Sequence, residues 1–273
     1  MIYTYYFSPT GTTKRVVDQL AIELNNLGDG SGISPYDFTL PHKRKMLVDD
    51  IHQMEEKTTE KDIILFGVPV YAGRVPNILL KSFMGMNGGG RWVVPVVVYG
   101  NRHYDDALLE LTRILSHANF KILAQAAFIG EHAFSLKLAA ERPDGLDFEA
   151  IHRLAEAITS KSVSKLPVLF DNETPLRPYY RPKNQKGEYF DFKAIRPHTD
   201  EKCNSCGVCA KVCPMGAIDT QRYSEIVGIC IKCCACVKRC PMHSKAFIDK
   251  SFIDHKEELE TLFAVRKQAE FNV

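Results

Sequence analysis

The sequence has 273 residues, of which 45% are hydrophobic and 25% are charged. This composition is ordinary for a globular protein, and the formal net charge of +2 gives no electrostatic reason to expect a nucleic-acid partner. No apolar run approaches the length of a membrane span, and the chain length suits one medium and one small domain.

The chain begins with a strand that leads into a polar turn. Residues 2–7 are aromatic and β-branched, as expected of a buried parallel strand. A helical pattern follows over 16–27, so backbone N–H groups and the helix dipole would converge on the turn and form an anion site. The turn has neither the lysine of a nucleotide triphosphate loop nor the GxGxxG of a dinucleotide fold. A polar capping turn that binds no ligand is the alternative.

Strands and helices continue to alternate. Further strands are predicted over 33–38, 62–68, 93–99 and 121–129, and helices over 45–56, 107–115 and 147–159. This alternation predicts an α/β fold with a doubly wound, five-stranded parallel sheet. Cofactors of such sheets bind outside the carboxyl ends of the strands, so the loops after strands one, three and four should meet at one edge.

The S-x-T-G-x-T turn resembles the phosphate loop of flavodoxins, and the resemblance covers roughly residues 1–160. It implies an FMN-binding domain over residues 1–164, in which the FMN phosphate is held by Ser8, Thr10, Gly11, Thr12 and Thr13.

By position in that family, the loops after strands three and four flank the isoalloxazine ring of FMN. A tyrosine offers the ring a π face, and a glycine lets the backbone approach it closely. Arginines beside the ring would stabilise reduced anionic FMN, unlike the acidic loops of many free flavodoxins. Core or surface tyrosines and solvated arginines are the alternatives. The two expected walls are Pro69, Val70, Tyr71, Ala72, Gly73 and Arg74, and Gly100, Asn101, Arg102 and Tyr104.

Two connecting segments are expected near the junction of the domains. Residues 130–135 follow the fifth strand and would rim either the flavin or the second domain. Residues 165–197 are rich in proline with interleaved tyrosines, which predicts a linker without regular structure that packs across the junction.

Eight of the nine cysteines form two matching runs. The first is Cys203-x2-Cys206-x2-Cys209-x3-Cys213-Pro214 and the second is Cys230-x2-Cys233-x2-Cys236-x3-Cys240-Pro241. This spacing resembles bacterial two-cluster ferredoxins, in which the fourth cysteine of each run ligates the other cluster. Structural zinc, which favours two CxxC pairs per ion, and disulfides are the alternatives. The resemblance implies one [4Fe–4S] cluster on Cys203, Cys206, Cys209 and Cys240, and a second on Cys213, Cys230, Cys233 and Cys236.

The ferredoxin domain is expected over residues 198–250, as a small α+β unit whose folding depends on its clusters. Cys234, the ninth cysteine, matches Gly207 of the first run. It is either a small buried side chain, or a redox-active thiol or alternative cluster ligand. Residues 251–273 are predicted to form an amphipathic helix with an Asp254-x-x-Glu257 capping box, packed on a domain or on a second copy of the chain.

These features predict an electron-transfer iron–sulfur flavoprotein that passes electrons between two [4Fe–4S] clusters and FMN, with other redox proteins as partners. One alternative is an FMN-dependent reductase of a small quinone-like acceptor, with Tyr104, His103 or Arg74 as the proton donor; the other is an iron–sulfur redox sensor. No catalytic residue is assigned. Thiolate-ligated clusters and a start without signal-peptide features predict a cytoplasmic location.

Overall fold

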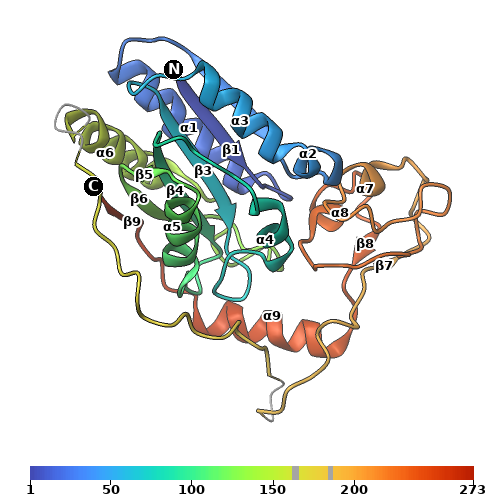
Figure 1. Cartoon of the computed structure of the whole chain (residues 1–273). Coiled ribbons are helices and arrows are strands. Elements are labelled where there is room, and N and C mark those ends of the chain that lie inside the picture. Colours follow the sequence, from blue (N-terminus) through green and yellow to red (C-terminus); the bar gives the residue numbers. More distant parts are fainter. Residues whose placement is uncertain (162–165, 184–186) are drawn as a thin grey trace.

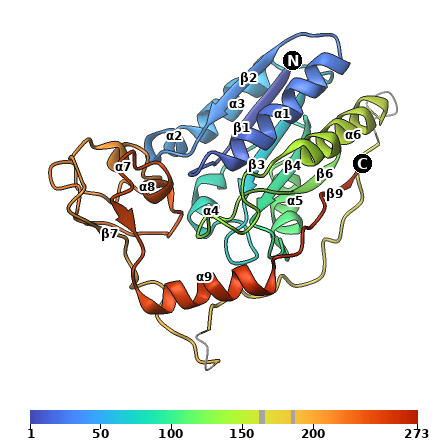
Figure 2. The same cartoon turned by 180° about the vertical axis from the view of Figure 1, so that it is seen from behind.

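The computed structural model describes residues 1–161, 166–183 and 187–273. Figures 1 and 2 show a large α/β unit and a smaller unit of short elements beside it, with helix α9 running along one side of both. No helix in the described ranges is long and apolar enough to cross a membrane.

The large unit is built on a sheet with the strand order β2-β1-β3-β4-β6-β9, and the short strand β5 also pairs with β4. Strands β1 to β6 pair in parallel. The first five positions therefore follow the flavodoxin-like order 2-1-3-4-5, which confirms the predicted fold class. The parallel strands are β1 (Ile2–Tyr6), β2 (Ile33–Asp37), β3 (Ile63–Pro69), β4 (Trp92–Tyr99), β5 (Lys121–Ile122) and β6 (Gln125–Ile129).

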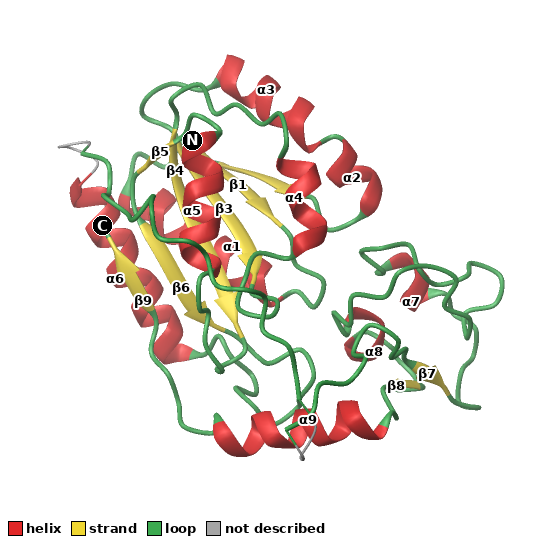
Figure 3. Ribbon diagram, turned by 60° about the horizontal axis from the view of Figure 1, so that its bottom comes forward, coloured by secondary structure: helices red, strands yellow, loops and turns green. Residues whose placement is uncertain are grey.

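Helices cover both faces of the sheet (Figure 3). One face packs on α1 (Thr12–Leu27) and α6 (Gly145–Lys161) through fully buried residues such as Leu20 and Leu154. The other packs on α3 (Leu47–Lys57), α4 (Asn77–Phe83) and α5 (Ala107–His117), while α2 (Pro41–Lys45) lies next to the smaller unit. Because alternate strand residues face opposite sides, Leu65 and Phe66 of β3 lie in different apolar clusters.

Some predicted elements differ in detail. The expected strand over 121–129 is divided into β5 and β6. The helix expected over 45–56 is preceded by a separate short helix, α2, and Met46 lies between the two. Helix α4 was not predicted, because its seven residues give too short a pattern.

The smaller unit contains β7 (His198–Thr199), α7 (Val208–Lys211), α8 (Ala235–Lys238) and β8 (Lys245–Ala246). Strands β7 and β8 pair antiparallel. Each short helix follows a residue with positive φ, Gly207 at 74° and Cys234 at 59°. The two cysteine runs thus fold alike, and Cys234 occupies a left-handed position where the first run has glycine.

The C-terminal segment differs from the expected helix over 251–273. Helix α9 spans Lys250–Leu262, and the chain then runs back to add β9 (Glu270–Asn272) antiparallel to β6. The capping box at Asp254 is also wrong, because Asp249 caps the helix and accepts hydrogen bonds from the amides of Ser251 and Phe252. The large unit is therefore completed by the end of the chain.

The linker, which is predicted to pack across the junction of the domains, contacts the large unit through backbone hydrogen bonds. The amide of Val168 donates to the Ile122 carbonyl at 2.8 Å, and the amide of Tyr180 donates to the Ala72 carbonyl at 2.8 Å. Residues 165 and 184–186 of the predicted linker, and the predicted domain boundary at 164, lie outside the described residues. Among the others, Lys183 and Tyr189 form an isolated bridge, and no helix or strand occurs before β7.

Candidate cofactor and cluster sites

The loop between β1 and α1 has the geometry of an anion site. Gly11 adopts φ 92° at the helix N-cap, a conformation that disfavours other residues. Within the described ranges, the amides of Thr10, Thr12 and Thr13 donate to no protein acceptor, and these residues border a cavity. Amides at a helix N-terminus bind anions through their N–H groups and the helix dipole. The loop therefore fits the phosphate of FMN.

Ser8 has a different place from the one expected. Its hydroxyl accepts a hydrogen bond from the Lys14 amide at 2.9 Å, and its own amide donates to Thr39 Oγ1 at 2.8 Å. The side chain is buried and does not border the cavity. Ser8 thus stabilises the conformation of the loop through its hydrogen bonds to Lys14 and Thr39, on the side away from the cavity.

The cavity has a volume of about 1420 Å³ and lies at the carboxyl edge of the sheet. Four groups of residues enclose it: the phosphate loop, the loops after β3, β4 and β6, the linker, and the smaller unit. Because both cysteine runs lie in it, we call this smaller unit, residues 198–250, the cysteine unit. The convergence of loops predicted from the strand order is therefore present. Of the residues predicted from the sequence, Thr10, Thr12, Thr13, Pro69, Val70, Tyr71, Ala72 and Gly100 border this cavity.

Tyr71 lies between the cavity and the cysteine unit. Burial raises the pKa of its phenol, and the nearby thiols of Cys233 and Cys234 raise it further. Tyr99, Phe134 and Tyr179 supply further aromatic walls. An apolar, aromatic cavity with a polar loop at one end fits the ring and phosphate of a flavin mononucleotide.

The other residues of the two predicted walls are engaged outside the cavity. Arg74 forms a bidentate ion pair with the buried carboxylate of Glu110, at 2.6 and 2.8 Å. Arg102 pairs with Asp105. Tyr104 donates to Glu270 Oε2 of β9 at 2.7 Å. The sequence could not give the directions of Arg74 and Tyr104, because their partners come from distant elements, α5 and β9; the partner of Arg102 lies in its own loop.

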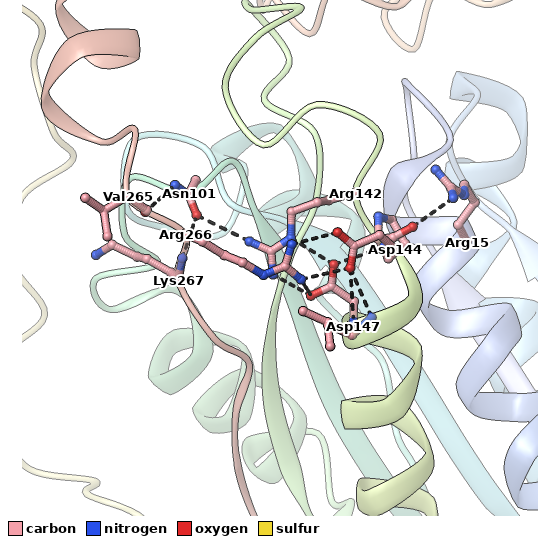
Figure 4. Close-up of polar contacts among 10 residues, drawn as sticks. Arg15, Asn101, Arg142, Asp144, Asp147, Val265, Arg266 and Lys267 are labelled. Carbon is pink, nitrogen blue, oxygen red and sulfur yellow. Dashed lines mark hydrogen bonds and ion pairs between the residues drawn. The ribbon is translucent and has the colours of Figure 1, made fainter.

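Asn101 fastens the C-terminal segment (Figure 4). Its side-chain amide donates to the carbonyls of Phe263 and Val265 at 2.6 and 2.9 Å, and its Oδ1 accepts from the Lys267 amide at 3.2 Å. Beside it, the buried Arg142 pairs with Asp147. Asn101 therefore stabilises the C-terminal segment and does not border the cavity, and Gly73 also lies outside the lining. We therefore do not propose as flavin contacts the five residues of the two predicted walls that lie outside the lining, which are Gly73, Arg74, Asn101, Arg102 and Tyr104.

The loop after β6 borders the cavity and also contacts the cysteine unit. His132 lies in the lining, and burial, with the nearby cations, lowers the pKa of its imidazole to about 3. Glu131 forms an ion pair with Lys238 of α8, and the Lys238 ammonium also donates to the carbonyls of His132 and Ser135 at 2.9 and 3.2 Å. Residues 130–135, expected to rim either the flavin or the second domain, thus border the cavity and also contact the cysteine unit.

The cysteines gather around two small hollows. One is bordered by Cys203, Cys206, Cys209 and Cys240, and the other by Cys213, Cys230, Cys233 and Cys236 together with the ninth cysteine, Cys234. These are the two sets expected from the spacing, with the fourth ligand exchanged between the runs. Within the described ranges, no three Cys, His, Asp or Glu side chains converge closely enough to hold a single ion; the thiols surround a space instead.

The donor chemistry of both sets fits iron–sulfur clusters. Burial and neighbouring thiols raise the pKa of Cys236 to about 12, so a thiolate there needs a compensating positive charge such as iron. Backbone amides donate to the ligand sulfurs at two positions, Ala217 to Cys213 Sγ at 3.3 Å and Ser244 to Cys240 Sγ at 3.4 Å. Such hydrogen bonds are a usual means of tuning cluster potentials.

The surroundings of the two sets differ. The first set includes the exposed Cys206, and the buried side chain of Lys245 borders the same hollow. The second is bordered by apolar residues such as Ile218 and Phe247, and its Cys230 and Cys233 also border the large cavity. Cys234 is buried beside the second hollow, with its sulfur 3.7 Å from the Lys232 carbonyl oxygen, as a packed structural side chain would be.

Comparison with known proteins supports the cysteine unit. Residues 198–219 match the family model described as a 4Fe-4S binding domain. No curated protein matches the chain.

Solved structures similar to this chain align with about three fifths of it. A rubredoxin oxygen:oxidoreductase from the anaerobe Desulfovibrio gigas is 13% identical, with a TM-score of 0.43. The alignment covers 60% of this chain and 36% of that chain, or about a third of that protein. A flavodoxin from the domain Archaea is 13% identical, with a TM-score of 0.42 and coverage of 59% and 98%. A Megasphaera elsdenii flavodoxin is 12% identical, with a TM-score of 0.39 and coverage of 59% and 99%. The strand order and the matched cysteine segment together show that the chain joins a flavodoxin-like fold to a 4Fe–4S ferredoxin-type domain.

Proposed function

We propose that the chain is an iron–sulfur flavoprotein that passes electrons between two [4Fe–4S] clusters and FMN. The observation that carries this proposal is that one cavity is bordered both by the phosphate loop and by Cys230 and Cys233. A bound cluster exchanges single electrons and FMN exchanges one or two. A chain that places both groups at one cavity can connect one-electron to two-electron chemistry.

The residues of the cavity have separable roles in this proposal. The amides of Thr10, Thr12 and Thr13 would bind the FMN phosphate, because they point to no protein acceptor in the described part of the chain. Tyr71 and Ala72 would flank the ring on the side of the cysteine unit. Linker residues such as Tyr179 and Phe190 also border the cavity and would restrict the access of water to the ring.

The exposure of the cysteines indicates where a redox partner protein would dock. Cys206 of the first set is exposed, whereas Cys233 of the second set is buried and borders the cavity. In this proposal the first set would exchange electrons with a partner protein and the second set with FMN. A cytoplasmic location stays a prediction from the thiolate ligands.

Anaerobic purification followed by iron, sulfide and flavin assays tests this proposal. About eight irons and one FMN for each chain are expected from the two sets of four thiolates. Eight irons without any FMN binding, even after incubation with an excess of FMN, would overturn it.

The size of the cavity favours a second candidate function. Ligand pockets usually measure roughly 300–1,000 Å³, and this cavity, at about 1420 Å³, extends beneath the aromatic residues of the linker, including Tyr179 and Phe190. The extra space would admit a small aromatic acceptor such as a quinone beside the flavin. Turnover of a panel of such acceptors faster than with free FMN would support a reductase, and the absence of turnover would exclude it.

A further inference from the structure

We propose that Arg239 of the cysteine unit completes the FMN phosphate site, so that the bound flavin ties the two domains together. This inference rests on the proposed FMN binding and adds to it a ligand from outside the flavodoxin-like domain. Arg239 follows α8 directly and precedes the ligand Cys240 in the sequence.

The geometry places a guanidinium over the phosphate loop. A Cβ atom built on Gly11 would lie 3.1 Å from Arg239 Nη2. This distance joins residues 228 positions apart (239 − 11) in two different domains. A larger side chain at residue 11 would meet the guanidinium, so the glycine leaves room for Arg239 beside the phosphate loop.

Arg239 has no other role in the described structure. Across residues 1–161, 166–183 and 187–273, its guanidinium forms no hydrogen bond or ion pair with the protein. The neighbouring Lys238 is fully engaged, with Glu131 and two carbonyl groups. Lys238 thus fixes α8 against the flavodoxin-like domain, and Arg239 is held near the loop with its hydrogen-bond donors free.

The cations of the loop's own helix are already occupied. Lys14 pairs with Asp18, and Arg15 donates to the Pro143 carbonyl at 2.9 Å. The loop itself offers only neutral amides and hydroxyls to a phosphate. Arg239 supplies a positive charge and a planar pair of donors, the arrangement that suits phosphate oxygens.

This arrangement couples flavin binding to the docking of the cysteine unit. Because Arg239 reaches the phosphate only while α8 lies against the loop, FMN binds the docked arrangement more tightly than the undocked one. Linkage is reciprocal, so FMN must stabilise docking by the same factor.

The test compares FMN with riboflavin, which lacks the phosphate, on the full-length iron-loaded protein. Dissociation constants are measured by quenching of flavin fluorescence for the wild type and for Arg239→Gln. We expect FMN to bind about tenfold more weakly to the variant, or about 1.4 kcal/mol, and riboflavin affinity to change less than twofold. Because Arg239 is exposed, the tenfold difference should shrink as the salt concentration rises.

Two further variants isolate the role of the charge. Arg239→Lys should retain part of the FMN affinity. Arg222→Gln, which removes an exposed arginine that pairs with Asp219 and Glu225 inside the cysteine unit, should leave FMN affinity unchanged. Iron content measured for every variant verifies that the clusters are intact.

The outcomes are distinct. Equal losses for FMN and riboflavin, or no loss for FMN, would overturn the role of Arg239. Failure of the wild type to bind any flavin would instead overturn the proposed function. As a second readout, bound FMN should slow protease cleavage of the linker in the wild type, and this protection should be lost in Arg239→Gln.

Discussion

The two domains of this molecule draw their stability from different sources. The flavodoxin-like domain buries an extensive apolar cluster on each face of its sheet, with Leu65 and Phe66 fully inaccessible at its centre. Within residues 198–250 of the described structure, Ile218 is the one large aliphatic or aromatic side chain among the buried residues, and the other buried hydrophobic residues are cysteines and alanines. The apolar cluster beside them joins Cys234 to Ile195 of the linker and Phe252 of α9. A unit that buries so few large apolar side chains cannot offset its conformational entropy by packing alone.

This difference indicates that metal ligation stabilises the cysteine unit, whereas side-chain packing stabilises the flavodoxin-like domain. The eight thiols around the two hollows take the structural place that Leu and Phe side chains occupy in the other domain. Loss of a ligand should therefore unfold one domain and spare the other, while a cavity in the core should do the reverse.

The largest expected effect follows from the loss of one ligand. Cys233→Ser should abolish the second cluster and unfold the cysteine unit, because the remaining thiols cannot complete the site. Iron should fall from about eight to about four or fewer for each chain, while the intrinsic fluorescence of Trp92, which lies in β4, should stay native.

The neighbouring Cys234 provides a matched control, because it is also buried and borders the second hollow but lies outside both predicted ligand sets. Cys234→Ser should keep its full iron content. Equal iron loss in the two variants would show that Cys234 is a ligand or that any change in this loop unfolds the unit.

A cavity in the other domain gives the complementary result. Phe66 contacts the rings of Phe38 and Phe83 at centroid distances of 5.4 Å. Phe66→Ala should lower the free energy of unfolding of this domain by roughly 3–5 kcal/mol, the usual cost for a buried phenylalanine. Urea denaturation followed by Trp92 fluorescence measures the loss.

Ile22→Ala is the control for this variant, because Ile22 lies on α1 and is 42% exposed. It should cost much less, and neither variant should change the iron content while the protein is folded. A large loss of iron from Phe66→Ala below the unfolding transition would show that the domains fold as one cooperative unit.

The parts that the sequence predicts best are those set by local pattern. The strand of residues 63–69 is a continuous apolar run, and cysteine spacing alone sorts eight thiols into the two sets that the structure brings together. The polar turn at Thr10 to Thr13 is likewise read from its own residues. In each case the information lies within a few neighbouring positions.

The parts that could not be predicted depend on contacts between distant segments. Strand β9 has only three residues, and its partner β6 lies about 145 positions earlier. Asn101 follows β4 at the carboxyl edge of the sheet, where a cofactor contact is expected. Its side-chain amide instead donates to the carbonyl of Val265 in the C-terminal segment. The approach of Arg239 to Gly11 exists only after the two domains dock.

The junction between the domains should be less stable than either of them. Removing the Lys238 ammonium leaves Glu131 and two carbonyl groups without their donor, and hydrogen bonds that involve a charged group contribute roughly 1.5–3 kcal/mol. Lys238→Met should therefore increase the fraction of molecules in which the cysteine unit is undocked from the flavodoxin-like domain. Protease cleavage of the linker should become faster by about tenfold or more.

Lys211→Met is the matched control, because Lys211 holds the equivalent position in the first cysteine run and is exposed. It should leave the cleavage rate unchanged. Equal rates for wild type and Lys238→Met would mean that the linker itself, rather than the ion pair, holds the domains together.

The smallest effect is a pH dependence that arises at the same junction. Burial holds the pKa of His132 down to about 3, with Lys238, His255 and Arg102 lowering it further, whereas the unfolded chain titrates near 6.5. Between these values the unfolded state binds a proton that the folded state does not. The contribution of His132 is therefore complete above pH 6.5 and is lost as the pH falls.

Between pH 6.5 and 5.5 this difference amounts to about 1 kcal/mol. The wild type should lose that much more stability over this interval than His132→Gln, as followed by urea denaturation with Trp92 fluorescence. His255, whose pKa is also lowered by burial, is present in both proteins, so its contribution cancels to first order. Parallel pH profiles would show that His132 takes up its proton within the folded protein, and that acid does not act on the junction through this side chain.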